Sequence, residues 1–208
     1  MSKIDFKKEY KRLYQPSKKD FQIVDVPPMQ FLMVDGHGDP NVAREYQDAL
    51  EALYAVAYKL KFASKKELER DYVVPPLEGL WWADDMDAFT VNRDKSAWDW
   101  TMMIMQPDWI TLEMYQKALV IVESQKELPA LTKLRLETYH EGLCAQTLHI
   151  GSYDDEGPTL HKLHTDFIPN NNLEMKGKHH EIYLSDPRKV APEKLKTIIR
   201  QPVNRISP

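Results

Sequence analysis

The same pattern of sequence occurs twice in this chain, and this internal duplication restricts the possible folds more than any other feature. In the first copy, the apolar segment 29–35 has the character of a β-strand and ends at Gly36, before a helical pattern. In the second copy, the strand-like segment 145–150 ends at Gly151, and acidic residues precede a shorter helix near 159–167. The order of strand, glycine turn and helix is therefore repeated.

Two further strand-like segments follow in each copy, and each copy closes on the dipeptide Gln-Pro. The segments are 78–83 and 98–105 before Gln106 in the first copy, and 179–184 and 197–200 before Gln201 in the second. The first copy is longer by about 20 residues, which we place in its longer helix and in an acidic loop at 83–95, where insertions are tolerated. Each copy is thus interpreted as a β-α-β-β unit.

The predicted fold is therefore α/β (α+β), with tandem β-α-β-β repeats forming a mostly antiparallel sheet, helices on one face and a ligand groove on the other. We expect a single domain over residues 1–208, made of two pseudo-symmetric halves at about 21–107 and 132–203. A helix near 111–124 joins the halves, and another strand is expected at 131–139.

The helix of the first copy is predicted by apolar or small residues that recur three and four positions apart, which places them on one side of the helix. Asp39 and Pro40 would supply its cap and first-turn proline. The predicted stripe comprises Val42, Tyr46, Ala49, Leu50, Leu53, Ala57 and Leu60. This stripe should pack on the core.

Composition and charge exclude several classes of function. The formal net charge of −4 supplies no basic field for phosphates, so we expect no nucleic-acid partner. Cys144 is the single cysteine, the N-terminus lacks the apolar run of a secretion signal, and no segment reaches the ~18 apolar residues that cross a bilayer. We therefore expect a cytoplasmic protein with no membrane partner. The oligomeric state does not follow from the sequence.

Glu181 is the main candidate for chemistry. Side chains alternate along a strand, so His179, Glu181 and Tyr183 share one face, and we interpret the face of His180, Ile182 and Leu184 as the helix-packed core. Glu181 would then face the groove. A carboxylate there should have a raised pKa unless a partner compensates, and could attract a cation, hold a proton or act as a base. Alternatively, Glu181 is a solvated residue or pairs with a nearby basic side chain.

The repeat predicts partners for Glu181 from the first copy. Tyr183 corresponds to Trp82, and His179 corresponds to Glu78. This would place Glu78 and Trp82 across the pseudo-twofold axis from Glu181 and Tyr183, so that two acids and two aromatic rings converge.

Aromatic residues suggest a surface for a flat or cationic ligand. Five tryptophans fall within 29 positions: Trp81, Trp82, Trp98, Trp100 and Trp109. By strand alternation Trp98 and Trp100 share a face, and so do Glu137 and Tyr139 on the strand after the connecting helix. Aromatic rings stack on planar ligands and attract cations. The alternative for each tryptophan is a place in the core.

Other residue patterns indicate less. His161 and His164 lie three positions apart and could both contact a metal ion, but no third ligand stands at a characteristic spacing, so we predict no metal site. Cys144 has no signature of a thiol nucleophile, and no glycine-rich phosphate loop occurs. The basic stretch 7–19 is expected to be a solvated helix or arm.

These segments together resemble the GyrI-like small-molecule-binding proteins, and within them the stand-alone group similar to cyclopropanoid cyclopropyl hydrolases. The matching pieces are 31–40, 79–82, 98–101 with Gln106 and Pro107, 141–142, 149–156 and 179–187. The resemblance implies the tandem fold and a concave pocket in which Glu181 recognises or activates the ligand. Only about twenty residues precede the first predicted strand, too few for the DNA-binding domain of related regulators, so we do not expect a sensor-regulator.

The resemblance further implies detoxification, and thus drug resistance, by hydrolysis of a strained cyclopropane fused to a cyclohexadienone, as in DNA-alkylating toxins. Glu181 would position or deprotonate a water, Trp82, Trp98 and Trp100 would enclose the flat substrate, and Tyr139 or Tyr183 would donate to the dienone oxygen. No metal or organic cofactor is implied. The alternatives are a non-catalytic protein that sequesters aromatic or cationic drugs, with Glu181 as counter-ion, and a modulator that binds a topoisomerase.

Overall fold

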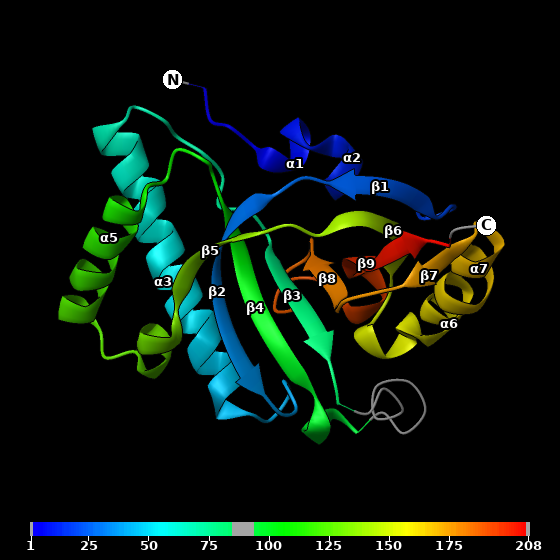
Figure 1. The fold of residues 1–208 in the computed structure, drawn as a ribbon. Helices are drawn as coiled ribbons and strands as arrows, with labels where there is room; N and C mark the ends of the chain where they lie inside the picture. Colours follow the sequence, from blue (N-terminus) through cyan, green and yellow to red (C-terminus); the bar gives the residue numbers. More distant parts are fainter. Residues whose placement is uncertain (1, 85–93, 207–208) are drawn as a thin grey trace. The chain divides into compact units, whose positions relative to one another are not determined.

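The computed structural model describes residues 2–84 and 94–206 of the chain (Figure 1). The chain divides into two compact units, which we call unit 1 and unit 2. Unit 1 comprises Met1–Glu9, Met29–Pro75 and Gly79–Tyr139, and unit 2 comprises Tyr10–Pro28, Pro76–Glu78 and His140–Pro208. Most of the acidic loop expected at 83–95 lies outside the described residues.

Unit 1 contains the first predicted β-α-β-β unit. Its elements are β2 (Met29–His37), α3 (Arg44–Glu67), β3 (Leu77–Trp82, whose first two residues group with unit 2) and β4 (Asp99–Gln106). α5 (Leu112–Gln125) and β5 (Arg135–Tyr139) complete it, and the strand order is β3-β4-β2-β5. α3 packs on β2 and β4, and α5 packs on α3 (Figure 1).

Unit 2 contains the second β-α-β-β unit, with β6 (Gly142–Ile150), a helical segment, β8 (His179–Tyr183) and β9 (Lys196–Arg205). The helical segment consists of η3 (Tyr153–Glu156), α6 (Gly157–His161), the π-helical η4 (Lys162–Phe167) and α7 (Ile168–Asn170). β1 (Gln22–Val26) and β7 (Leu173–Met175) are added, and the strand order is β1-β6-β9-β8, with β7 also paired to β9. The predicted fold class is confirmed.

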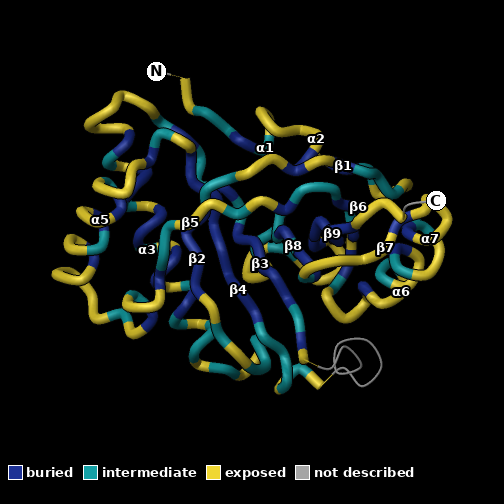
Figure 2. Tube along the Cα trace, in the orientation of Figure 1, coloured by how far each residue is buried: buried dark blue, intermediate teal, exposed yellow. Residues whose placement is uncertain are grey.

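The remaining elements are short. They are α1 (Phe6–Glu9), α2 (Lys11–Tyr14), η1 (Lys95–Ala97), η2 (Pro129–Lys133) and η5 (Pro192–Lys194). The longest buried runs lie in β4 and β9, the last strand of each copy (Figure 2). No helix within the described ranges combines the length and apolar character needed to span a bilayer.

Strand registers support the alignment of the two copies. Gln30 pairs with Gln106 between β2 and β4, and Ala145 pairs with Gln201 between β6 and β9. Gln30 and Ala145 are 115 positions apart, which is also the separation of Gly36 and Gly151. The glycine turn and the closing glutamine therefore match in the same register.

The strand that precedes each copy pairs with the first strand of the other copy. β1 precedes β2 in the chain but pairs with β6, and β5 precedes β6 but pairs with β2. The exchange is symmetric, because Gln22 pairs with Gln146 while Glu137 pairs with Phe31, each partner again 115 positions from its counterpart. The two compact units therefore differ from the halves expected at 21–107 and 132–203.

α3 begins later than predicted. Asp39 stabilises a turn by accepting from the Asn41 amide at 2.9 Å, and the helix is preceded by Ala43, which has no side-chain cap. Val42 therefore lies before the helix and is 81% exposed, contrary to its place in the predicted stripe. The remaining stripe is largely correct: Ala49, Leu53, Ala57 and Leu60 are buried, while Tyr46 and Leu50 are half-buried.

Candidate functional site

β8 carries Glu181, and its pairing with β9 shows which face of the unit 2 sheet each side chain occupies. Glu181 lies opposite Ile199, and His180 lies opposite Arg200. Directly opposite residues share a face. Ile199 packs in one cluster with Leu163 of η4, so this face, the helix-side face, is the one that the helical segment covers. The prediction that Glu181 points away from the helices is therefore wrong, although the predicted alternation along the strand is correct.

Tyr183 and His179 contact the Glu181 carboxylate, which is 14% exposed. The Tyr183 hydroxyl donates to Oε2 at 2.8 Å, and His179 Nε2 lies 3.4 Å from Oε1. Glu156 lies near enough to Glu181 to affect its pKa. Burial raises the pKa of Glu181, but its hydrogen bonds and the nearby His179 charge outweigh burial and keep the pKa below its usual value. The expected rise is thus reversed, because partners compensate.

Tyr153 and Glu156 of η3 lie near Glu181 and Tyr183. The Tyr153 ring packs edge-to-face on the Tyr183 ring, with centroids 5.7 Å apart and an interplanar angle of 84°. Burial raises the pKa of Tyr153 to about 12, and the negative charges of Glu181 and Glu156 act in the same direction. Glu156 is only 4% exposed. The sequence pattern indicated Glu156 only as a helix cap, because nothing in it shows which turn of the second helical segment lies over β8.

Two buried polar atoms lie in the same part of unit 2. Thr197 is opposite Tyr183 on the helix-side face, and His164 belongs to the π-helical η4, a type of turn frequent at functional sites. Within the part of the chain that the structure describes, neither Thr197 Oγ1 nor His164 Nε2 has a hydrogen-bond partner. Burial lowers the pKa of His164 to about 4, helped by the charges of His179 and His161. His164 is therefore a neutral imidazole at neutral pH.

The opposite face of the unit 2 sheet holds a buried charged network. His180 Nδ1 lies 2.8 Å from Glu141 Oε1, and His180 Nε2 lies 3.0 Å from Glu78 Oε2. The Tyr14 hydroxyl donates to Glu78 Oε1 at 2.8 Å, and Arg200 Nη1 donates to Glu141 Oε2 at 3.1 Å. All five side chains are almost fully buried.

This network corrects three predictions. Glu78 bonds His180, whose side chain lies on the opposite face from Glu181, so Glu78 and Glu181 do not converge. The face of His180 is charged and satisfied by ion pairs, and so is not the apolar helix-packed core that we expected. The basic stretch 7–19 is only partly a solvated arm, because Tyr14 is 2% exposed.

The three ion pairs determine the charges in the network. Burial lowers the pKa of His180, but Glu141 and Glu78 outweigh this effect and raise it to about 9. Burial raises the pKa of Glu141, but His180 and Arg200 bring it down to about 2. Both cations and Glu141 are therefore charged at neutral pH. A buried network of this kind, with its charges paired, favours one specific arrangement of the strands that carry it.

The tryptophans of unit 1 do not form the group that the sequence indicated. Trp100 is fully buried, and a Cβ on Gly36 would stand 2.1 Å from its ring, so Trp100 fills the core over the glycine. Trp98 packs edge-to-face on Trp81, with centroids 5.8 Å apart. Because side chains alternate along β3, Trp82 points to the face opposite Trp81. The structure therefore pairs Trp98 with Trp81.

Two other aromatic residues of unit 1 lie elsewhere. Tyr139 is half-buried at the end of β5, opposite Met29, and the tyrosine that contacts Glu181 is Tyr183. Trp109 stacks near Phe6 and donates through Nε1 to Ser64 Oγ at 3.0 Å. Trp109 is thus structural. A role for Tyr139, Trp82 or Trp98 in ligand binding stays a prediction.

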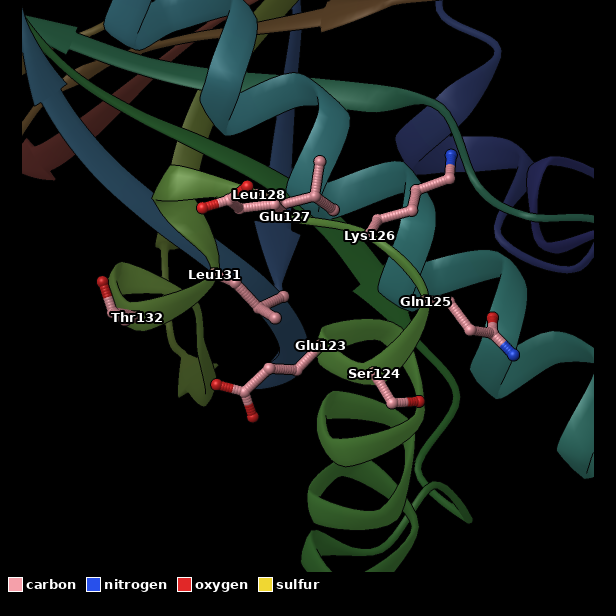
Figure 3. A pocket seen from close by; sticks show the side chains of 8 residues that line it. All are labelled: Glu123, Ser124, Gln125, Lys126, Glu127, Leu128, Leu131 and Thr132. Atoms are coloured by element: carbon pink, nitrogen blue, oxygen red, sulfur yellow. The ribbon is translucent and has the colours of Figure 1, made fainter.

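The hollows on the surface of unit 1 lie away from any of these groups. One of about 400 Å³ surrounds the C-terminal end of α5 and the loop to η2, where Glu123, Lys126 and Leu131 are among the lining side chains (Figure 3). A second of about 410 Å³ lies between α3 and α5. Neither hollow is lined by a buried ionisable side chain. Across the described residues, no group of three or more His, Cys, Asp or Glu side chains is arranged to hold a metal ion.

Comparisons with known proteins show the family of this chain. A family model described as the GyrI-like small molecule binding domain matches residues 19–204. No curated protein matches the chain.

Solved structures are similar to this chain as well, two of them in sequence and fold. An uncharacterized conserved protein from Listeria innocua is 42% identical, with a TM-score of 0.89 over 97% of this chain and 100% of that chain. A hydrolase from Listeria innocua is 40% identical, with a TM-score of 0.85 over 97% of this chain and 100% of that chain. The EcmrR C-terminal domain, at 9% identity and a TM-score of 0.56 over 90% of this chain and 98% of that chain, is alike in fold alone.

Proposed function

Because the chain belongs to the GyrI-like small-molecule-binding family, we propose that it binds flat aromatic or cationic molecules at Glu181 and hydrolyses cyclopropanoid toxins there. The observation that carries this proposal is the Glu181 carboxylate itself, which is mostly buried, ionised, and held by Tyr183 and His179. A buried carboxylate with fixed orientation can align one water molecule or one cation. The hydrolase from Listeria innocua, 40% identical over nearly the whole chain, supports an enzyme.

The proposed reaction adds one water molecule across a strained bond. The water oxygen bonds to a methylene carbon of the cyclopropane, and the bond from this carbon to the dienone ring breaks. That electron pair moves to the dienone oxygen, and the six-membered ring becomes aromatic. The water proton passes to Glu181 and then to the phenolate oxygen, so the product is a phenol that carries a hydroxyalkyl group.

The lowered pKa of Glu181 makes it a weak base. Proton removal by Glu181 therefore contributes less to the reaction than the strain of the substrate does. Ring strain and the gain of aromaticity supply most of the driving force, and the main task of Glu181 is to orient the water. Tyr153, whose hydroxyl stays protonated because its pKa is about 12, is a suitable donor to the developing phenolate. The sequence suggested Tyr139 or Tyr183 for this role, and we propose Tyr153 because its ring packs on Tyr183, which donates to Glu181.

The test is turnover of a spirocyclopropyl cyclohexadienone by catalytic amounts of protein. We expect the dienone absorbance to disappear over many equivalents of substrate, with the hydroxyalkyl phenol as the product. Loss of one equivalent per chain, without product, would replace hydrolysis with sequestration. An ionised carboxylate near aromatic rings would then serve as the counter-ion of a bound cation.

A further inference from the structure

The solvent-facing side of α3 carries three aromatic rings, which we call the aromatic row. Tyr54, Tyr58 and Phe62 stand four positions apart and are 37%, 47% and 58% exposed. Adjacent ring centroids are 6.4 Å apart, with interplanar angles of 31° between Tyr54 and Tyr58 and 30° between Tyr58 and Phe62. Single exposed apolar side chains are common on protein surfaces, whereas a contiguous set of them is typical of an interaction surface.

The aromatic row is not needed to hold α3 in place. The opposite side of α3, which includes the buried residues Ala49, Leu53 and Leu60, already packs on β2 and β4. A pair of apolar side chains four positions apart adds only about 0.2–0.5 kcal/mol to the stability of a helix. Covering the rings would gain more, because full burial of one large apolar side chain is worth about 1.5–3 kcal/mol.

Two opposite charges lie at equal distances from the middle of the row. Glu51 precedes Tyr58 by seven positions and Lys65 follows it by seven, and both side chains are exposed. Seven residues make close to two full turns, so the three residues lie along one line of the helix surface. Lys65 Nζ lies 3.4 Å from Asp71 Oδ2, but Asp71 has a shorter contact of 2.7 Å to Lys61 Nζ. Lys65 is 55% exposed and can also reach an acidic group of another chain.

This surface is complementary to a second copy of itself. When two α3 helices pair antiparallel about a twofold axis at Tyr58, a residue before Tyr58 faces the residue equally far after it in the partner. Tyr54 then faces the partner's Phe62, and Glu51 faces the partner's Lys65. We propose that the chain forms a homodimer through this side of α3, with the aromatic rows at the centre and a Glu51–Lys65 ion pair at each end.

The size of the surface predicts how tightly the dimer associates. Three half-exposed aromatic side chains offer on the order of 300 Å² per protomer. Even with the flanking charged side chains added, the total remains below the ~1,200 Å² at which standard stable interfaces begin. The dimer is therefore weak and reversible, with a Kd on the order of micromolar or above. The proposal goes beyond ligand binding at Glu181 and does not depend on it.

Sedimentation velocity of the whole chain between about 1 µM and about 1 mM tests the dimer. The sedimentation coefficient of wild type should rise with concentration from the monomer value to the dimer value. Phe62→Ser should raise the Kd about tenfold, because it removes a ring from the interface. Leu112→Ser is the matched control and should keep the wild-type Kd, because Leu112 is 60% exposed and is the first residue of α5. A wild type that stays monomeric, or equal effects of both substitutions, would overturn the proposal.

Exchange of the charges tests the antiparallel arrangement. Glu51→Lys alone and Lys65→Glu alone should each raise the Kd roughly fivefold, because each places like charges opposite one another at both ends of the interface. The two variants mixed together should associate with about the wild-type Kd, since each acidic side chain again faces a basic one. The Glu51→Lys/Lys65→Glu double variant should do the same. Single variants with the wild-type Kd, or a mixture that associates no better than either variant alone, would show that α3 does not pair in this way.

Discussion

At the scale of single residues, Glu181 is defined by what surrounds it. Its burial alone would raise its pKa, yet Tyr183, His179 and Glu156 lower it. The alternation of His179, Glu181 and Tyr183 follows directly from the sequence of a strand. Glu156 and Tyr153 could not be predicted, because they reach Glu181 from a different element, and only tertiary packing brings a turn over a strand.

Thr197 provides a test of the same site. Its hydroxyl is buried and has no hydrogen-bond partner in the described ranges, so Thr197→Val should leave the free energy of unfolding unchanged or raise it by about 1 kcal/mol. Urea unfolding measures this. If ligand binding uses the hydroxyl, the Val variant should also bind a cyclopropanoid product more weakly, and Thr197→Ser should restore affinity. A clear loss of stability in the Val variant would show that the hydroxyl has an internal role.

Gly36 tests the assignment of Trp100 to the core. A Cβ at position 36 would stand 2.1 Å from the Trp100 ring, so Gly36→Ala should destabilise the protein by about 1–3 kcal/mol. Chemical denaturation gives this value. Gly157→Ala is the matched control, because a Cβ there meets nothing within 4 Å. Similar stability for both variants would contradict the packing described for Trp100.

At the scale of elements, most strands and the long helices could be predicted, but the faces of β8 could not. β2 and α3 could be predicted because residues 31–34 form a buried apolar run and Ala49, Leu53, Ala57 and Leu60 of α3 are buried on one side. β1 and β7 were not predicted, since each is short and lies at an edge or beside a single partner strand. The face of His180 was misassigned because the pattern suggested an apolar core where ion pairs satisfy buried charges.

The His180 network predicts how stability depends on pH. The pKa of His180 is raised from its usual 6.5 to about 9, so its contribution is complete below about pH 6.5 and is lost as pH rises through 9. The pKa of Glu141 is lowered to about 2, so its contribution is present above about pH 4.5 and is lost as pH falls through 2.

Thermal unfolding at pH 6 and pH 9.5 measures the upper limit. Wild type should lose stability on the order of 3 kcal/mol over this range, from a pKa difference of about 2.5. His180→Gln should start less stable and lose much less. The same loss in both proteins would show that another group is responsible.

At the scale of the whole molecule, the exchange of β1 and β5 decides how the chain can be divided. The duplication and its register could be predicted from Gly36, Gly151 and the closing glutamines, but the exchange could not. A strand's partner depends on long-range pairing, which local periodicity does not record. Each half of the sequence therefore lacks one strand of the unit that it mainly forms.

Cutting the chain after α5 tests this exchange. Fragments 1–127 and 128–208 should co-purify when expressed together, because β1 pairs with β6 and β5 pairs with β2. Each fragment alone should be insoluble or unfolded by circular dichroism. Independent folding of either fragment would mean that the exchanged strands are dispensable.

The initial rate of dienone loss in Glu181→Gln, compared with wild type, tests the central claim most directly. Gln keeps the size of the side chain but removes the negative charge that orients water. We predict a fall in kcat of at least 100-fold, with an unchanged Kd for the neutral phenol product and an unchanged melting profile. A Gln variant that turns over substrate at the wild-type rate would contradict the claim that Glu181 is the centre of the site.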